Sequence, residues 1–175
     1  MKLNYGSGEA KLEGYINIDI EESTKPDIIL DLRKAPFQYE SNSIDEVICT
    51  HNLEHIEYKY HPQVLTEFWR VLIPNKGTLI VAYPEFEKCV KNFLTNHQGL
   101  KDFWRATLYG RQLYPGDYHV TPMITSDFIV LLKNIGFINI KHGPEEGQEF
   151  NTFLVCEKGP KGRTHEDVLR EEIFG

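Results

Sequence analysis

The segment HNLEH, residues 51–55, contains the side chains best suited to chemistry in this sequence. It fits the H-x-x-E-H pattern of zinc peptidases, in which two histidines on one helical face bind the metal and the glutamate is the general base. The preceding residues, EVICT, are typical of a strand, so no helical turn leads into the motif. No residue on a downstream helix stands out as a third ligand. We therefore expect no stoichiometric zinc at HNLEH, and we expect Glu54 and His55 to fix a helix start or to pair with neighbours.

The composition limits the class of protein. A chain of 175 residues with 41% hydrophobic residues is long enough for one domain with a sizeable core. The net charge is −7 and no Lys/Arg cluster interrupts it, which disfavours duplex nucleic acid as a partner and favours a cationic ligand. No apolar run approaches the roughly 18 residues of a membrane span. The N-terminal MKLNYGSGEA lacks a signal-peptide core, so we expect a cytoplasmic protein without a membrane partner.

The three cysteines give no sign of a disulfide framework or of a cysteine zinc site. Cys49, Cys89 and Cys156 are far apart, odd in number and outside any C-x-x-C pair. We expect them to be reduced core residues.

Strand and helix patterns alternate along the chain, which indicates an α/β sheet. The last two strands are expected to be antiparallel to each other, and residues 110–124 form a Gly/Pro-rich loop of the length that usually has a function. Strands are expected at 2–6, 15–20, 27–32, within 41–50, and at 77–83, 137–142 and 150–157. Helices are expected at 62–73, 85–97, 100–109 and 125–135, the last one capped by Thr125 or Ser126 and ended by Gly136.

Polar and glycine residues follow the ends of four expected strands. In open α/β sheets, ligands bind beyond the carboxyl ends of the strands. We therefore expect one edge of the sheet to gather Gly6-Ser7-Gly8, Asp19-Ile20, Asp31-Leu32 and His51-Asn52.

Five segments in this order resemble the motifs of small class I S-adenosylmethionine-dependent methyltransferases: NYGSGEAKLEGYINIDI, PDIILDL, SNSIDEVICTHNLEHI, FWRVLIPNKGTLIVAYPE and ITSDFIVLLKNIGF. The resemblance spans roughly residues 2–157. It implies a doubly wound, mostly parallel seven-stranded sheet of order 3-2-1-4-5-7-6 with the last strand antiparallel. The domain would cover residues 1–158, followed by a linker and short helix over 159–175. The helices that precede the first strand in this family are lacking, which suggests an open site or a lid supplied by a partner.

The resemblance also implies S-adenosylmethionine as cofactor and assigns roles at the sheet edge. Asp19 would accept both ribose hydroxyls, Asp31 and the Leu32 backbone would meet the adenine edge, and His51 and Asn52 would lie near the methionine and sulfonium. Each residue also has a plain structural role open to it, as a turn glycine, a turn cap or a polar strand end. The implied cofactor-binding residues are Gly6, Ser7, Gly8, Asp19, Ile20, Asp31, Leu32, His51 and Asn52, and no metal is implied.

Only seven residues separate Gly6 from Gly14, which departs from the family pattern. A parallel crossover ordinarily takes a dozen residues or more, so the helix that usually follows the first strand must be nearly absent. The cofactor contacts of residues 7–11 therefore stay open.

Methyl transfer from a sulfonium is an in-line displacement, so the protein must hold the nucleophile in place and accept its proton where needed. The leading catalytic candidates are His119, His51 and Tyr83, with Glu85, Asp117 and Tyr118 also placed to face the site. A loop histidine bonded to backbone is an equally good reading of His119. We expect methylation of a small-molecule or nucleotide- or sugar-like substrate. The alternatives are a catalytically weak or inactive cofactor-binding module that acts as a subunit or regulator, and a zinc hydrolase.

The C-terminal tail carries an apolar stripe. A helix is expected from Thr164, capped in the pattern of a capping box with Asp167, and its apolar residues are Val168, Leu169, Ile173 and Phe174. An isolated helix this short is marginal in water. We expect it to dock on its own domain or on a second copy, with a homodimer favoured.

Overall fold

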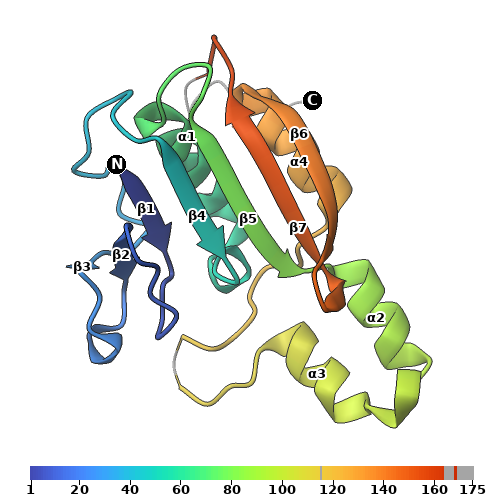
Figure 1. The fold of residues 1–175 in the computed structure, drawn as a ribbon. Helices are drawn as coiled ribbons and strands as arrows, with labels where there is room; N and C mark the ends of the chain where they lie inside the picture. Colours follow the sequence, from blue (N-terminus) through green and yellow to red (C-terminus); the bar gives the residue numbers. More distant parts are fainter. Residues whose placement is uncertain (115, 164–167, 169–175) are drawn as a thin grey trace.

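A single seven-stranded sheet organises the chain (Figure 1). The computed structural model describes residues 1–114, 116–163 and 168. The strand order is β3-β2-β1-β4-β5-β7-β6, with β1 to β5 parallel and β7 antiparallel to both β5 and β6, so the predicted sheet is confirmed. The strands are β1 (Lys2–Tyr5), β2 (Ile16–Asp19), β3 (Ile28–Ile29), β4 (Glu46–Thr50), β5 (Thr78–Pro84), β6 (Phe137–Glu145) and β7 (Gln148–Lys158).

The register of the parallel strands places their carboxyl ends at one edge. Tyr5 of β1 lies opposite Ile18 in β2 and Cys49 in β4, and Cys49 lies opposite Val81 in β5. The segments after these strands therefore emerge together, as the sequence predicts. They begin at Gly6, Ile20 and His51.

Two helices cover one face of the sheet and enclose the core. α1 (His61–Val71) and α4 (Thr125–Ile135) lie behind the central strands in Figure 1. Because side chains alternate along a strand, every second residue of β4 and β5 points toward these helices and is fully buried. Those residues are Val47, Cys49, Leu79, Val81 and Tyr83. All three cysteines are buried and unpaired, which confirms the expectation of free core thiols.

Helix α1 ends at Val71, two residues before the predicted end at Ile73. Leu72 adopts an extended conformation, and its strand-like bridge to Ile44 continues with a hydrogen bond from Ile73 N to the Ile44 carbonyl (2.9 Å). Pairing of these residues with the segment before β4 replaces the last half-turn of helix.

Residues 6–15, between β1 and β2, form no helix, as the short spacing predicts. Two buried asparagines hold this loop instead. Asn4 Nδ2 donates to Asn17 Oδ1 (3.0 Å) and to the Ala10 carbonyl (3.3 Å), while Asn17 Oδ1 also accepts from Leu12 N (2.9 Å). Asn4 lies between Leu3 and Tyr5 on the strand, so it points to the sheet face opposite α1 and α4. The loop therefore covers this face where the family's helix would lie.

Two further helices project beyond the carboxyl ends of the strands (Figure 1). They are α2 (Phe86–Leu94) and α3 (Lys101–Tyr109), joined through a 3-10 turn at His97–Gly99. The helix predicted over 85–97 ends at Leu94 because Asn96 adopts a left-handed conformation with φ 47°.

Glu85 caps two helices at once. Its carboxylate accepts from Lys88 N (3.0 Å) at the start of α2 and from Thr125 N (3.3 Å) at the start of α4. Ile124 occupies the N-cap position of α4 and Thr125 is the first helical residue. The prediction that Thr125 or Ser126 would be the cap is therefore wrong, since an acid from another element satisfies this helix end. Gly136 ends α4 in the left-handed conformation, as predicted.

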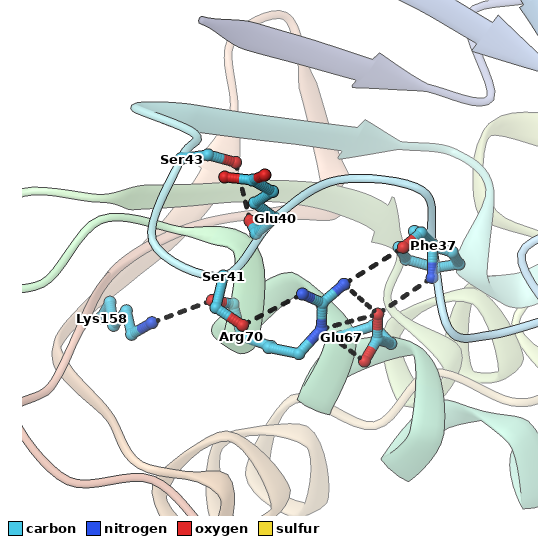
Figure 2. A network of polar contacts seen from close by, with 7 residues as sticks. All are labelled: Phe37, Glu40, Ser41, Ser43, Glu67, Arg70 and Lys158. Atoms are coloured by element: carbon cyan, nitrogen blue, oxygen red, sulfur yellow. Dashed lines mark hydrogen bonds and ion pairs between the residues drawn. The ribbon is translucent and has the colours of Figure 1, made fainter.

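A polar network fastens the connection between β3 and β4 to α1 (Figure 2). The Glu67 carboxylate accepts from Phe37 N (3.0 Å) and from Arg70 Nη2 (2.8 Å). Arg70 in turn donates to Ser41 Oγ (3.1 Å) and to the Phe37 carbonyl (3.2 Å). The Lys158 ammonium, at the end of β7, donates to the Arg70 carbonyl (3.1 Å). The network thereby links the loop, α1 and the sheet.

The tail helix expected from Thr164, including Asp167, Leu169, Ile173 and Phe174, lies outside the described residues. Val168 is described and is fully buried with the core. None of the described helices is long and apolar enough to span a membrane.

Candidate functional site

The loop after β1 approaches the β4 loop very closely. Gly6 has φ +67°, and a Cβ at this position would lie 2.2 Å from Asn52 Nδ2, so only glycine fits. Ser7 is buried and its backbone N–H donates to the Ile18 carbonyl (3.1 Å). Gly8 has φ +49° with open space around it. The predicted residues Gly6, Ser7 and Gly8 thus form a tight turn at the sheet edge.

Asp19 joins the loops after β1 and β2. Its Oδ2 accepts from Gly8 N (2.7 Å) and its Oδ1 from Glu21 N (2.8 Å). An ionised carboxylate has about four lone-pair sites, so each oxygen retains capacity for a further donor such as a ribose hydroxyl. The neighbouring Ile20 is 56% exposed, which leaves an apolar side chain available beside that carboxylate.

The residues after β3 are arranged differently from the expectation. β3 covers only two of the six residues predicted as strand, because the chain turns at residues 31–34. The Asp31 carboxylate accepts from Arg33 Nε (2.9 Å) and Nη2 (3.1 Å), and the adjacent guanidinium holds its pKa below the usual value despite the opposing effect of burial. The Leu32 side chain is buried in the core. The Leu32 side chain is therefore not available to a ligand, and the role implied for its backbone stays a prediction.

His51 lies in a left-handed conformation directly after β4. Its φ is 50° and its N–H donates to the Ala82 carbonyl (2.7 Å). Nε2 lies 3.2 Å from the Glu145 carboxylate, and Nδ1 lies 3.7 Å from Glu54. The Glu54 carboxylate, followed by Glu145, raises the pKa of His51.

HNLEH therefore does not form a peptidase helix. Only Leu53–His55 make a 3-10 turn, so His51 and His55 do not share a helical face. The Asn52 side chain packs against Gly6, and its Oδ1 is 3.8 Å from Cys49 Sγ.

A pocket of about 250 Å³ opens beside this segment. Its walls come from the turn after β4, the end of β5, α2, α3 and the loop of residues 110–124. Glu54 and His119 supply its charged and titratable groups, and Tyr109, Pro122 and Met123 are among its apolar residues. The pocket thus adjoins the carboxyl ends of the strands, where the cofactor motifs emerge.

Glu54 is 2% exposed, and neither of its carboxylate oxygens has a hydrogen-bond partner among the described residues. The Glu54 carboxylate caps no described helix but lies 3.7 Å from His51 Nδ1, so of the two roles expected for it the pairing with a neighbour is the one observed. Its backbone carbonyl accepts from Val120 N (2.9 Å) and Thr121 N (3.2 Å). These bonds bring the 110–124 loop onto HNLEH.

His119 lies in that loop beside Glu54 and His55. Its ring centroid is 4.8 Å from that of His55, and its backbone N–H donates to the Tyr109 carbonyl (3.1 Å). Burial lowers the pKa of His119, which favours the neutral, basic form of the ring near pH 7.

The other catalytic candidates do not face the pocket in the same way. Tyr83 is fully buried against Phe128, its hydroxyl donates to Thr125 Oγ1 (3.4 Å), and burial raises its pKa to about 12. Glu85 is occupied as a helix cap. Asp117 is buried and accepts from Leu113 N (3.1 Å).

Tyr118 is 48% exposed, and its backbone carbonyl accepts from His55 Nδ1 (3.0 Å). Of the six candidates, the structure thus places His119 in the pocket and His51 next to it.

Sequence reasoning missed Glu145 and the isolation of the Glu54 carboxylate. Glu145 lies 94 residues from His51 and reaches it from the β6–β7 hairpin. No local pattern signals such a contact. The H-x-x-E-H pattern includes Glu54, but the lack of a helix before the motif argued against a metal-binding role for this residue.

Comparison with known proteins supports the fold and the cofactor. The model of a family described as "Methyltransferase domain" matches residues 14–81, which include Asp19, Asp31 and His51. None of the curated protein sequences matches significantly.

Several similar solved structures are methyltransferases by name. A SAM-dependent methyltransferase from Archaeoglobus fulgidus has a TM-score of 0.64 at 15% identity, covering 90% of this chain and 85% of that one. One from Methanosarcina mazei has a TM-score of 0.64 at 14% identity, covering 91% and 92%. At these identities the likeness concerns the fold.

The described site also suits the cofactor that such a fold binds. Gly6 permits the tight turn against Asn52, the Asp19 carboxylate can accept further hydrogen bonds, and the buried Ser7 Oγ has no partner among the described residues. The sheet order and these residues fit the class I methyltransferase fold, and the match of residues 14–81 to a methyltransferase domain indicates S-adenosylmethionine as the cofactor.

Proposed function

We propose that this protein methylates a small-molecule acceptor, of a nucleotide- or sugar-like kind, that binds in the pocket beside HNLEH. The observation that carries the proposal is the position of this pocket. It adjoins the carboxyl edge of the sheet and contains one buried carboxylate and one histidine, from Glu54 and His119. Such a combination of apolar walls with a few convergent polar groups is typical of small-ligand sites.

The size and charge of the pocket limit the acceptor. A volume of about 250 Å³ lies below the range usual for drug-sized ligands, so a single ring or a similarly small group fits best. The Glu54 carboxylate favours an acceptor that presents a hydrogen-bond donor or a positive charge. Duplex nucleic acid is disfavoured by the chain's net charge of −7.

The cofactor, when bound, supplies an activated methyl group. The chain's own part is to hold the acceptor atom about 3 to 3.5 Å from that group and to take up its proton. His119 can do the latter because burial keeps its ring neutral. Asp19, at the end of β2, would hold the ribose, and the Gly6–Gly8 turn would admit the methionine part. The buried, unpaired cysteines fit action in the cytoplasm, where thiols stay reduced.

A second candidate is a cofactor-binding module that acts as a subunit or regulator. It is favoured by the pairing of Asp31 with Arg33, which occupies a carboxylate implied to face adenine. Binding without turnover would support this function.

Titration calorimetry with S-adenosylmethionine and S-adenosylhomocysteine tests the cofactor site. Removing a carboxylate that accepts two hydroxyls should cost charge-assisted hydrogen bonds of about 1.5 to 3 kcal/mol each. We expect Asp19→Ala to bind roughly 10- to 100-fold more weakly. Asp102→Ala, which removes an exposed acid paired with Arg105, should bind like wild type. Circular dichroism checks that all three proteins are folded.

Turnover is then measured as formation of S-adenosylhomocysteine with pools of small metabolites. Product formation that depends on His119 and on an added acceptor supports methyl transfer. Equal affinities of wild type and Asp19→Ala would overturn the role of Asp19. If folded wild type binds neither compound, the methyltransferase function itself is refuted.

A further inference from the structure

We propose that Glu54, His55 and His119 form a binding site for one divalent transition-metal ion of the zinc type. The three residues come together where the turn after β4 meets the 110–124 loop. One ligand atom from each lies within 4.8 Å of the other two. His51, the first residue of the H-x-x-E-H pattern, is not part of this set.

The distances between the three ligand atoms are close to those that a zinc ion requires. With metal–ligand distances of about 2.0 to 2.2 Å, the donor atoms of a tetrahedral site lie roughly 3.4 Å apart. Small rotations of the two imidazoles, whose centroids are 4.8 Å apart, would close the remaining gap. Two imidazoles and one carboxylate are a common donor set for zinc and for other divalent transition metals.

The state of the Glu54 carboxylate is the main argument for a cation. It is 2% exposed, and neither oxygen accepts a hydrogen bond from any residue that the structure describes. The nearest charged group is His51, with Nδ1 at 3.7 Å, and Nε2 of that ring already faces Glu145. A buried carboxylate without a hydrogen-bond partner is costly. A divalent ion between Glu54 and the two histidines would remove this cost.

His55 is arranged as a metal ligand usually is. A ligating imidazole commonly donates its other ring N–H to a backbone carbonyl, which fixes the tautomer and the ring orientation. His55 Nδ1 is 3.0 Å from the Tyr118 carbonyl. When Nδ1 donates this bond, the Nε2 lone pair is free for a metal ion.

The backbone holds the ligand-bearing segments in register. The Glu54 carbonyl accepts from Val120 N and Thr121 N, and Thr121 Oγ1 donates to the Ile56 carbonyl (2.6 Å). These bonds lie directly beside Glu54 and His119. The site is therefore preorganised by main-chain contacts that do not themselves use the ligand atoms.

This proposal replaces the expectation of no zinc at HNLEH. That expectation assumed two ligands on one helix and a third on a later helix. The structure instead offers neighbouring residues of a 3-10 turn and a histidine from a loop. Three protein ligands leave an open position, and both Glu54 and His119 line the pocket. If the proposed function holds, a metal-bound His119 would no longer accept the proton itself, and the metal ion would instead make an acceptor hydroxyl at that position more acidic.

The test uses full-length protein freed of metal with a chelator. Zn²⁺ alone is titrated by calorimetry, and Co²⁺ by its visible absorption, which reports the coordination number. We expect one site per chain in wild type. Glu54→Gln, His55→Ala and His119→Ala should each bind Zn²⁺ at least about 100-fold more weakly, since even the loss of a residue that only hydrogen-bonds to a metal ligand costs 10- to 100-fold. His142→Ala, which removes an exposed histidine of β6, is the matched control and should bind like wild type.

Thermal unfolding gives a second readout that does not depend on activity. Saturating Zn²⁺ should raise the melting temperature of wild type and of His142→Ala, but not that of the three ligand variants. Circular dichroism confirms folding, and His55→Gln and His119→Gln replace any alanine variant that does not fold. Absence of zinc binding in wild type, or equal binding in ligand variants and control, overturns the proposal.

The same samples separate this proposal from the methyltransferase function. Titration with S-adenosylhomocysteine in the presence and absence of Zn²⁺ reports on the cofactor site alone. Zinc binding without cofactor binding would uphold the metal site and refute the proposed function. Cofactor binding without zinc binding would refute the metal site and leave the proposed function to be decided by the turnover assay.

Discussion

At the scale of single residues, the site depends on positions where the backbone adopts a left-handed conformation. Gly6, Gly8 and His51 all have positive φ at the carboxyl edge of the sheet. His51 adopts this strained conformation although it is not a glycine. The hydrogen bond from its N–H to the Ala82 carbonyl and its contact with Glu145 hold it there. Strain of this kind is typical of functional sites, where the surrounding structure maintains it.

Gly6 and Gly8 offer a direct test of close approach against backbone strain. Alanine at either position costs about 1 to 2 kcal/mol for a left-handed conformation. Only at Gly6 would the new Cβ also collide with the Asn52 side chain, whereas Gly8 has open space. We expect Gly6→Ala to lose more stability and more cofactor affinity than Gly8→Ala, measured by urea unfolding and calorimetry. Equal losses in the two variants would show that the contact with Asn52 is unimportant.

At the scale of elements, buried polar pairs replace missing or short secondary structure. Asn4 and Asn17 secure the loop where a helix would ordinarily follow β1. Glu67 and Arg70 secure the irregular connection between β3 and β4 (Figure 2). In both cases side-chain groups satisfy backbone donors and acceptors that a helix would satisfy internally.

The Glu67–Arg70 pair should therefore contribute more to the free energy of unfolding than an exposed pair with the same spacing. Arg70→Met leaves a mostly buried carboxylate without its cation, and we expect a loss of about 1 to 3 kcal/mol in the free energy of unfolding. The double variant Glu67→Gln/Arg70→Met should recover part of this loss, because the uncompensated charge is gone. Urea unfolding measures all three proteins.

Arg105→Met is the matched control. Arg105 and Asp102 are also three residues apart, but their side chains are 58% and 91% exposed. Its effect should stay within about 0.5 kcal/mol. A loss as large as that of Arg70→Met would contradict the importance of burial.

At the scale of the whole molecule, Val168 in the C-terminal segment adds to the core. Val168 is fully buried and belongs to the core cluster, although it follows the last strand by ten residues along the chain. Burying a valine contributes about 1.5 to 3 kcal/mol. We therefore expect Val168 to contribute to the stability of the domain.

Deletion of residues 164–175 should lower the melting temperature, since that burial is lost. Val168→Ala should show a smaller loss in the same direction, whereas Val130→Ala, at a 57% exposed position of α4, should not. Differential scanning calorimetry measures the change, and light scattering measures whether deletion also abolishes the dimer that the sequence favours. If deletion alters neither the melting temperature nor the mass, the tail has no structural role.

The sequence by itself determined the architecture and the position of the cofactor edge. Period-two and period-3.6 patterns located the strands and most of the helices, and the acids and glycines at strand ends marked one edge of the sheet. These features are local, so single segments encode them. Where prediction failed, as for the ends of α1 and the cap of α4, a residue from another element replaced a local interaction. Only the tertiary structure decided the site itself. The contacts of His119 with Glu54 and His55 and of Glu145 with His51 join residues far apart in the chain, and such contacts depend on packing that no local pattern records.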